Sequence, residues 1–108
     1  GSYTEAMQGC GVVMHTASPF VLDGFTDANE ALVRPALEGT RNVLNSVNQC
    51  ESVKRVVLTS SVAAVYGDNE DILRVPSGVF TEDHWNVTSS VTHNPYQYSK
   101  VVGTRIRA

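Results

Sequence analysis

The stretch Val53-Lys-Arg-Val-Val-Leu-Thr-Ser-Ser61 carries the strongest strand signal in this chain. Its β-branched and apolar residues, followed by small hydroxyl residues, predict a short strand. A second run, Gly11-Val-Val-Met-His-Thr-Ala-Ser18, is continuously apolar rather than alternating, and it stops at Pro19. Continuous apolar runs are typical of strands that are covered on both faces, as in parallel sheets. The two runs therefore predict two strands of one parallel sheet.

A helix is expected between these strands. Thr26 or Asp27 can cap its start, and Glu30 stands at capping-box spacing from Asp27. Its apolar stripe recurs at the helical period and consists of Leu32, Ala36, Gly39, Val43 and Val47. Pro35 has no N–H and should kink the helix, whereas Gly39 would let it approach a sheet closely. Strand, helix and strand form a βαβ unit, for which a right-handed crossover is expected.

The remaining segments suggest that the chain is one part of a larger domain. Residues 3–9 predict the end of a helix closed by Gly9. Residues 67–95 form a long irregular stretch, which in a compact domain is usually functional or disordered. A further helix begins near Tyr96, and the chain stops at Ala108 about three turns later. Two strands are too few for a doubly wound α/β sheet, so we expect an internal fragment of a longer chain.

The composition is that of an ordinary globular domain, with 42% apolar and 18% charged residues and a net charge of -3. The scattered basic residues give no reason to expect nucleic acid or an anionic membrane as a partner. No stretch approaches the roughly 20 apolar residues that span a bilayer. Cys10 and Cys50 fit no metal motif and predict buried or partly buried free thiols. We therefore expect a cytoplasmic protein without a bound metal, in which the sequon at Asn86 is not used.

Tyr96 and Lys100 are the candidate proton donor and its charged neighbour. They lie four residues apart, so both side chains leave the same face of the last helix, one turn apart. A nearby ammonium favours phenolate and lowers a phenol pKa that is otherwise about 10. Tyr98 points to a different face and has Val102 at its own i+4 position. If one of these tyrosines reacts, it is therefore Tyr96.

Small polar residues end both predicted strands, at 16–18 and at 59–61. Ligands of open parallel sheets bind beyond the carboxyl ends of the strands. Ser61 and Tyr96 would converge there on one substrate oxygen, with Tyr96 as general acid and Ser61 as a donor to the developing oxyanion. Lys100 would hold a cofactor hydroxyl. A cofactor must supply the hydride, because no side chain can.

Three sequence blocks support a family assignment: His15-Thr-Ala-Ser-Pro19, Leu58-Thr-Ser-Ser-Val-Ala-Ala-Val65 and the segment from Tyr96 to Lys100. Together they resemble the extended short-chain dehydrogenase/reductase superfamily, and within it the dihydroflavonol 4-reductase and cinnamoyl-CoA reductase group. The resemblance implies a Rossmann domain that binds NADP(H), with Ser61, Tyr96 and Lys100 as the catalytic triad. The implied reaction is hydride transfer to a small ketone or aldehyde of the dihydroflavonol or cinnamoyl type.

The resemblance also implies what these residues lack. The family's Gly-rich phosphate loop does not occur, because no Gly-x-x-Gly-x-x-Gly pattern is present. We therefore expect the 108 residues to be inactive alone. Cinnamoyl-CoA reductases carry Asn-Trp-Tyr-Cys-Tyr-Gly-Lys around the tyrosine, whereas Asn94-Pro-Tyr-Gln-Tyr-Ser-Lys100 argues against coenzyme A thioesters. The expected cofactor contacts are Ala17, Ser18, Thr59, Ser60, Tyr96 and Lys100.

Two other functions remain open. Val-Tyr-Gly ending at Gly67 is shared with NAD-dependent nucleotide-sugar epimerases and dehydratases. Dehydratases of that group place an acidic residue beside the strand-end hydroxyl, where this chain has Val62 and Ala63. A non-catalytic dinucleotide-binding sensor is the second alternative, although a sensor needs no proton donor. The oligomeric state and the stereochemistry stay open.

Three bulky side chains are expected to pack rather than react. His15 lies inside a predicted strand and should be a core histidine. Phe80 and Trp85 should pack the long loop onto the rest of the domain.

Overall fold

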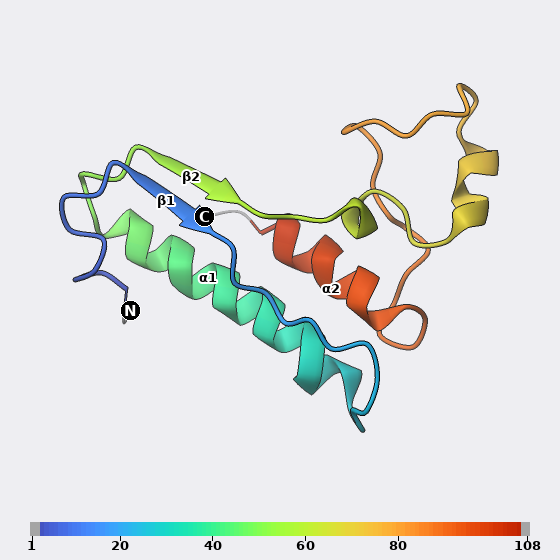
Figure 1. Ribbon diagram of the computed structural model, residues 1–108, viewed down its shortest axis with the longest axis horizontal. Helices are drawn as coiled ribbons and strands as arrows, with labels where there is room; N and C mark the ends of the chain where they lie inside the picture. The colour runs from blue at the N-terminus through green and yellow to red at the C-terminus, as the bar shows by residue number, and fades with distance from the viewer. Residues whose placement is uncertain (1–2, 107–108) are drawn as a thin grey trace.

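A computed structural model describes residues 3–106 as a two-stranded parallel sheet with two longer helices beside it (Figure 1). Strand β1 spans Val12–His15 and pairs in parallel with β2, Arg55–Leu58, so that Val12 lies opposite Arg55 and His15 opposite Leu58. Helix α1, Arg34–Asn48, connects the strands, and helix α2, Pro95–Thr104, follows the long loop. The shorter helical turns are η1, Asn29–Val33, η2, Val62–Ala64, and η3, Asn69–Arg74. The predicted βαβ unit is confirmed.

The sheet is covered on one face. Val13 packs against the buried cluster that includes Val43 of α1 and Cys50. Successive side chains of a strand point to opposite faces, so Val12 and Met14 point away from α1. Their side chains are 53% and 70% exposed. The prediction of coverage on both faces is therefore wrong within the described residues.

A side-chain cap and a wide helical turn precede α1 and Pro35. Asp27 Oδ1 accepts backbone N–H bonds of 2.9 and 3.2 Å from the second and third residues after it, which confirms Asp27 as a capping residue. Glu30 instead pairs with Arg34 at 2.8 Å. Directly before Pro35, η1 is a π-helical turn in which the Arg34 N–H bonds the carbonyl five residues earlier. This wide turn precedes a residue that has no N–H to donate.

The close approach expected at Gly39 occurs at Gly103. A Cβ at Gly39 would have nothing within 4 Å, whereas a Cβ at Gly103 would lie 3.6 Å from the Cβ of Ala36. Gly103 and the fully buried Ser99 lie on the face of α2 that packs against neighbouring elements. Small residues thus bring α2 close to α1, and the contact at Gly39 was predicted wrongly.

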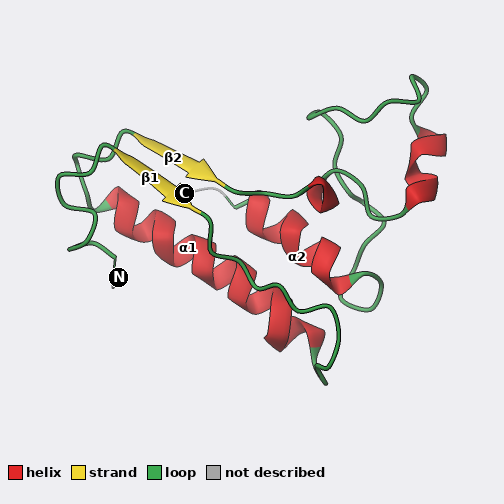
Figure 2. Cartoon of the chain, in the orientation of Figure 1, coloured by secondary structure: helices red, strands yellow, loops and turns green. Residues whose placement is uncertain are grey.

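Within residues 3–106, irregular backbone connects these helices and strands (Figure 2). Residues 3–9 form turns rather than the predicted helix end, although Met7 N–H donates to Tyr3 O at 3.0 Å. Gly9 has a φ of 77°, the left-handed conformation expected of a glycine that closes a helical turn. Between residues 3 and 106, no helix combines the length and the apolar character that crossing a bilayer requires.

The buried side chain of Asn86 is the centre of a hydrogen-bond network in the long loop, a role that the sequence pattern does not indicate. Its side chain is buried, and Nδ2 donates to Ala63 O and to Ser89 Oγ, both at 2.8 Å. Its backbone N–H donates to Ala64 O at 2.9 Å. Oδ1 accepts the backbone N–H groups of Thr88 and Ser89 at 3.1 and 3.0 Å. The nitrogen that glycosylation would modify is therefore buried and already donates two hydrogen bonds, which supports an unused sequon.

Gly67 lies against this centre, and its replacement should destabilise the fold. A Cβ there would clash with Ser89 Oγ and lie 2.6 Å from Thr88 Oγ1 and 2.7 Å from Asn86 Oδ1. We expect Gly67→Ala to lower the free energy of unfolding by about 1–3 kcal/mol, because these groups must move or lose hydrogen bonds. Urea unfolding of the complete product of the gene that encodes this chain measures the change. Gly39→Ala is the control and should raise stability by up to about 1 kcal/mol; a Gly67→Ala variant as stable as wild type would contradict the prediction.

Candidate active site

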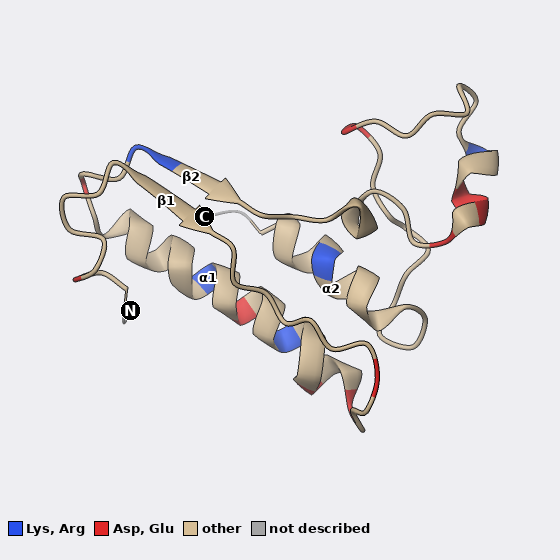
Figure 3. Cartoon of the chain, viewed as in Figure 1, with Lys and Arg blue, Asp and Glu red and all other residues tan. Residues whose placement is uncertain are grey.

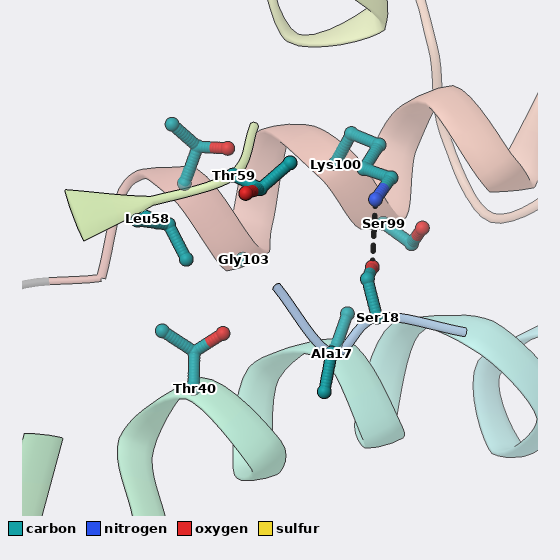
Figure 4. Close-up of a pocket in the computed structure, with 10 residues that line it drawn as sticks. Ala17, Ser18, Thr40, Leu58, Thr59, Ser99, Lys100 and Gly103 are labelled. Atoms are coloured by element: carbon teal, nitrogen blue, oxygen red, sulfur yellow. Dashed lines mark hydrogen bonds between the residues drawn. The ribbon is translucent and has the colours of Figure 1, made fainter. Parts of the chain in front are cut away.

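The candidate site lies where both strands end and α2 passes (Figure 4). A space of about 10 Å³, room for about one water molecule, brings together four of the six expected cofactor contacts: Ala17, Ser18, Thr59 and Lys100. Both strand exits, α1 and α2 contribute to its lining, whose other members are Ala36, Thr40, Leu58, Ser99, Gly103 and Thr104. The structure thus brings these four residues together, and their contact with a cofactor stays a prediction.

Lys100 connects the exit of β1 to α2. Its Nζ donates to Ser18 Oγ at 2.7 Å, as the dashed line in Figure 4 shows. The same Nζ lies 5.5 Å from the centre of the Tyr96 ring, within the range of a cation–π contact. Burial lowers the pKa of Lys100, because removal from water disfavours the ammonium. One positive charge thus faces both a strand-end hydroxyl and the phenol.

The two tyrosines of α2 occupy different surroundings, as their spacing predicts. The ring of Tyr96 meets Phe20 edge to face, with ring centres 5.2 Å apart. Tyr98 instead lines a groove between α1 and α2 together with Leu37 and Arg41. Phe20 was not predicted to belong to the site, because it stands in a loop without periodicity. Its side chain is 69% exposed, so an apolar ring stays in solvent beside the phenol.

The two serines that follow β2 have different partners. Ser60 Oγ lies 2.6 Å from Thr104 Oγ1. Ser61 Oγ accepts the Ala63 N–H at 3.1 Å and caps η2. A hydroxyl that accepts a hydrogen bond keeps its own proton to donate.

Ser61 lies outside the small space beside Lys100. It lines a neighbouring, larger cavity of about 560 Å³. The other residues around that cavity are Ser60, Val62, Ala64, Val65, Glu82, His84, Trp85 and Thr104. Thr104 lines both hollows, so the two meet at the last residue of α2.

The bulky side chains pack as predicted. His15 is 6% exposed, its Nε2 lies 3.3 Å from a threonine hydroxyl of α1, and burial lowers its pKa. Phe80 stacks on Tyr66 with ring centres 4.7 Å apart and an interplanar angle of 8°. Trp85 lies against the Arg105 guanidinium at 4.7 Å and ties the loop to the residue after α2.

Other candidate ligand groups are sparse. Both cysteines are free; Cys50 is buried, but Cys10 is exposed, which contradicts the expectation for that residue. Across residues 3–106, no cluster of three or more His, Cys, Asp or Glu side chains could hold a metal ion. In this part of the chain, Lys and Arg are spread over both long helices, η3 and the start of β2 (Figure 3).

Known proteins are similar to this chain in sequence and in fold. The model of the 3-beta hydroxysteroid dehydrogenase/isomerase family matches residues 2–105. A cinnamoyl-CoA reductase of Medicago truncatula is 55% identical over 65 residues, which are 60% of this chain and 20% of that protein. A cinnamoyl-CoA reductase of Petunia hybrida is 43% identical over 103 residues, 94% of this chain and 28% of that protein.

A solved structure extends the comparison to three dimensions. The crystal structure of a yeast methylglyoxal/isovaleraldehyde reductase complexed with NADPH matches with a TM-score of 0.79 and 34% identity. The match covers 96% of this chain and 33% of the yeast chain. The chain thus spans about a fifth to a third of the length of these relatives.

Proposed function

The chain belongs to the 3-beta hydroxysteroid dehydrogenase/isomerase family, and we propose that it carries the proton-donating part of an NADPH-dependent carbonyl reductase. Its βαβ unit is part of a Rossmann-type doubly wound sheet, like that of the yeast reductase. The observation that carries the proposal is the 2.7 Å bond from Lys100 to Ser18, with Tyr96 beside the same ammonium. This bond joins a strand exit, where parallel sheets bind ligands, to the ammonium that lies beside the proposed proton donor Tyr96.

The residues at the strand exits fit a nicotinamide dinucleotide. Ala17, Ser18 and Thr59 have small, exposed side chains, so a ribose and a flat ring can approach the backbone closely. The Lys100 ammonium and the Ser18 hydroxyl are hydrogen-bonding groups suited to ribose hydroxyls. When bound, NADPH supplies the hydride for carbonyl reduction.

The chain's own residues supply the remaining steps. Tyr96 gives its phenolic proton to the carbonyl oxygen as negative charge develops there. Ser61 donates its hydroxyl proton in a hydrogen bond to the same oxygen. Lys100 stabilises the phenolate that remains, because its ammonium lies over the ring. Reprotonation of the phenolate completes the cycle.

We propose a small ketone or aldehyde of the dihydroflavonol or cinnamoyl type as the substrate, reduced in the cytoplasm. The name of the yeast methylglyoxal/isovaleraldehyde reductase supports a small ketone or aldehyde, and the names of the plant relatives support a cinnamoyl group. The exposed ring of Phe20 beside Tyr96 supports it as well, because an aromatic substrate can pack against that ring.

A substrate panel tests this proposal on the complete gene product. NADPH oxidation is followed with aldehydes, dihydroflavonols, acyl-CoA thioesters and sugar nucleotides. Turnover of ketones or aldehydes supports a reductase, whereas activity on sugar nucleotides alone would indicate an epimerase or dehydratase. Dinucleotide binding without turnover of any substrate would indicate a sensor.

The 108 residues purified alone should be inactive in the same assay. They contain no Gly-rich loop to hold the pyrophosphate, so NADPH would lack most of its binding contacts. Aldehyde-dependent NADPH oxidation by this chain alone would contradict the expectation.

Ser61→Ala should lower kcat of the complete gene product about 10²- to 10³-fold, the usual cost of losing one donor to an oxyanion. The expectation follows from the free O–H that Ser61 retains while its oxygen accepts the Ala63 N–H. Ser60→Ala is the matched control, and we expect less than about a tenfold loss, because Ser60 Oγ is bonded to Thr104. If kcat falls further in Ser60→Ala than in Ser61→Ala, Ser60 and not Ser61 is the donor to the oxyanion.

A further inference from the structure

The carboxylate of Asp68, in the long loop, binds both residues that precede Pro95 and the start of α2. Its Oδ2 lies 2.8 Å from His93 Nε2, and its Oδ1 accepts the Asn94 Nδ2 at 2.8 Å. We propose that Asp68 and Asn94 are positioning residues. Together they hold the start of α2 in place, and with it the side chain of Tyr96. This inference rests on the proposed role of Tyr96 as proton donor.

The backbone of Asn94 is the first reason. Among residues 3–106 it is the one non-glycine with a positive φ, at 54° with ψ of 59°. Asn tolerates this left-handed conformation better than most residues, but it persists only where the surroundings hold it. Asn94 O accepts the Tyr98 N–H at 3.0 Å, the first hydrogen bond of the helix. The conformation of Asn94 therefore sets where α2 begins, and Tyr96 follows two residues later.

The second reason is that Asp68 is itself anchored. Asp71 Oδ2 accepts the backbone N–H groups of Asp68 and Gly67 at 3.1 and 3.0 Å. It also accepts the Thr88 hydroxyl at 2.7 Å. The Thr88 backbone N–H bonds the buried Asn86 at 3.1 Å. A continuous set of hydrogen bonds thus runs from the centre of the long loop to the residue that starts the catalytic helix.

The contacts are better suited to positioning than to stabilisation. The His93 and Asp68 side chains are 56% and 38% exposed, and polar contacts this exposed contribute little to stability. Small displacements of a reacting group, by contrast, reduce rates strongly. Loss of these contacts should therefore lower turnover more than it lowers the stability of the fold.

Four variants of the complete gene product test the inference. Asp68→Ala removes both acceptors and should lower kcat about 10- to 100-fold, with KM for NADPH and Tm close to wild type. Asp68→Asn keeps an acceptor for Asn94 and should restore most of the turnover. Asn94→Ala loses the side-chain bond and the tolerance for positive φ, whereas Asn94→Gly keeps the backbone conformation. Asn94→Gly should therefore be the more active of the two.

The outcomes separate this inference from the proposed function. Glu70→Ala, at an exposed position of η3, is the control and should leave kcat unchanged. If Tyr96→Phe abolishes turnover while Asp68→Ala and Asn94→Ala retain it, the positioning role is wrong and the proposed function stands. A loss that Asp68→Asn does not relieve, or that only follows a fall in Tm, also overturns the positioning role. If Tyr96→Phe keeps full activity, both proposals fail.

Discussion

Tyr96→Phe should lower kcat for carbonyl reduction about 10²- to 10⁴-fold in the complete gene product, with KM for NADPH nearly unchanged. The substitution removes one hydroxyl and keeps the ring, so the edge-to-face contact with Phe20 and the position under Lys100 are preserved. The loss would then report proton donation alone. Steady-state NADPH oxidation over a range of ketone or aldehyde concentrations separates kcat from KM.

Tyr98→Phe is the matched control for this experiment. It makes the same chemical change two residues further along α2, on a face that lines the groove beside Leu37 and Arg41. We expect its kcat to stay within about twofold of wild type, because no proton transfer depends on that hydroxyl. Equal losses in the two variants would mean that the phenol acts through the fold, and full activity of Tyr96→Phe would remove Tyr96 from the mechanism.

Lys100→Met should impair both turnover and cofactor binding. It removes the ammonium that bonds Ser18 at 2.7 Å and lies over the Tyr96 ring, while keeping most of the aliphatic stem. We expect kcat to fall about 10²-fold and KM for NADPH to rise about tenfold, since a hydrogen bond to a charged group contributes roughly 1.5–3 kcal/mol. Lys54→Met, at an exposed position before β2, is the control and should change neither parameter.

The pH profile gives this prediction a second readout. Burial lowers the pKa of Lys100, so its ammonium loses its proton at a lower pH than that of a free lysine. A role for the ammonium therefore means that turnover declines as pH rises through this lowered pKa. In Lys100→Met the decline should vanish along with most of the rate. An alkaline limb that persists unchanged in the variant would assign it to another group.

Local sequence patterns indicated where the strands and several candidate site residues lie. Continuous apolar runs placed β1 and β2, and the four-residue spacing placed Tyr96 and Lys100 on one face. These features depend on residues close in the sequence, because strand burial and helical periodicity are properties of short segments. The same reasoning put Ala17 and Ser18 at a strand exit, where the structure finds them beside Lys100.

Contacts between distant segments had no comparable signal. The packing of Gly103 on Ala36, the burial of Asn86 and the bonds from Asp68 to Asn94 each join residues that no periodic pattern connects. The π-helical turn that precedes Pro35 likewise has no signal in the sequence pattern.

The order of amino acids therefore determined the βαβ unit, the family and the residues available for chemistry. Only the folded chain decided how those residues are held. It showed that the Lys100 ammonium bonds the Ser18 hydroxyl and that Asp68 bonds Asn94, the residue before α2. It also showed that Ser61 Oγ accepts a backbone N–H, whereas Ser60 Oγ is bonded to the Thr104 hydroxyl. Hydrogen bonds are short and directional, so their partners are set by three-dimensional packing and not by spacing along the chain.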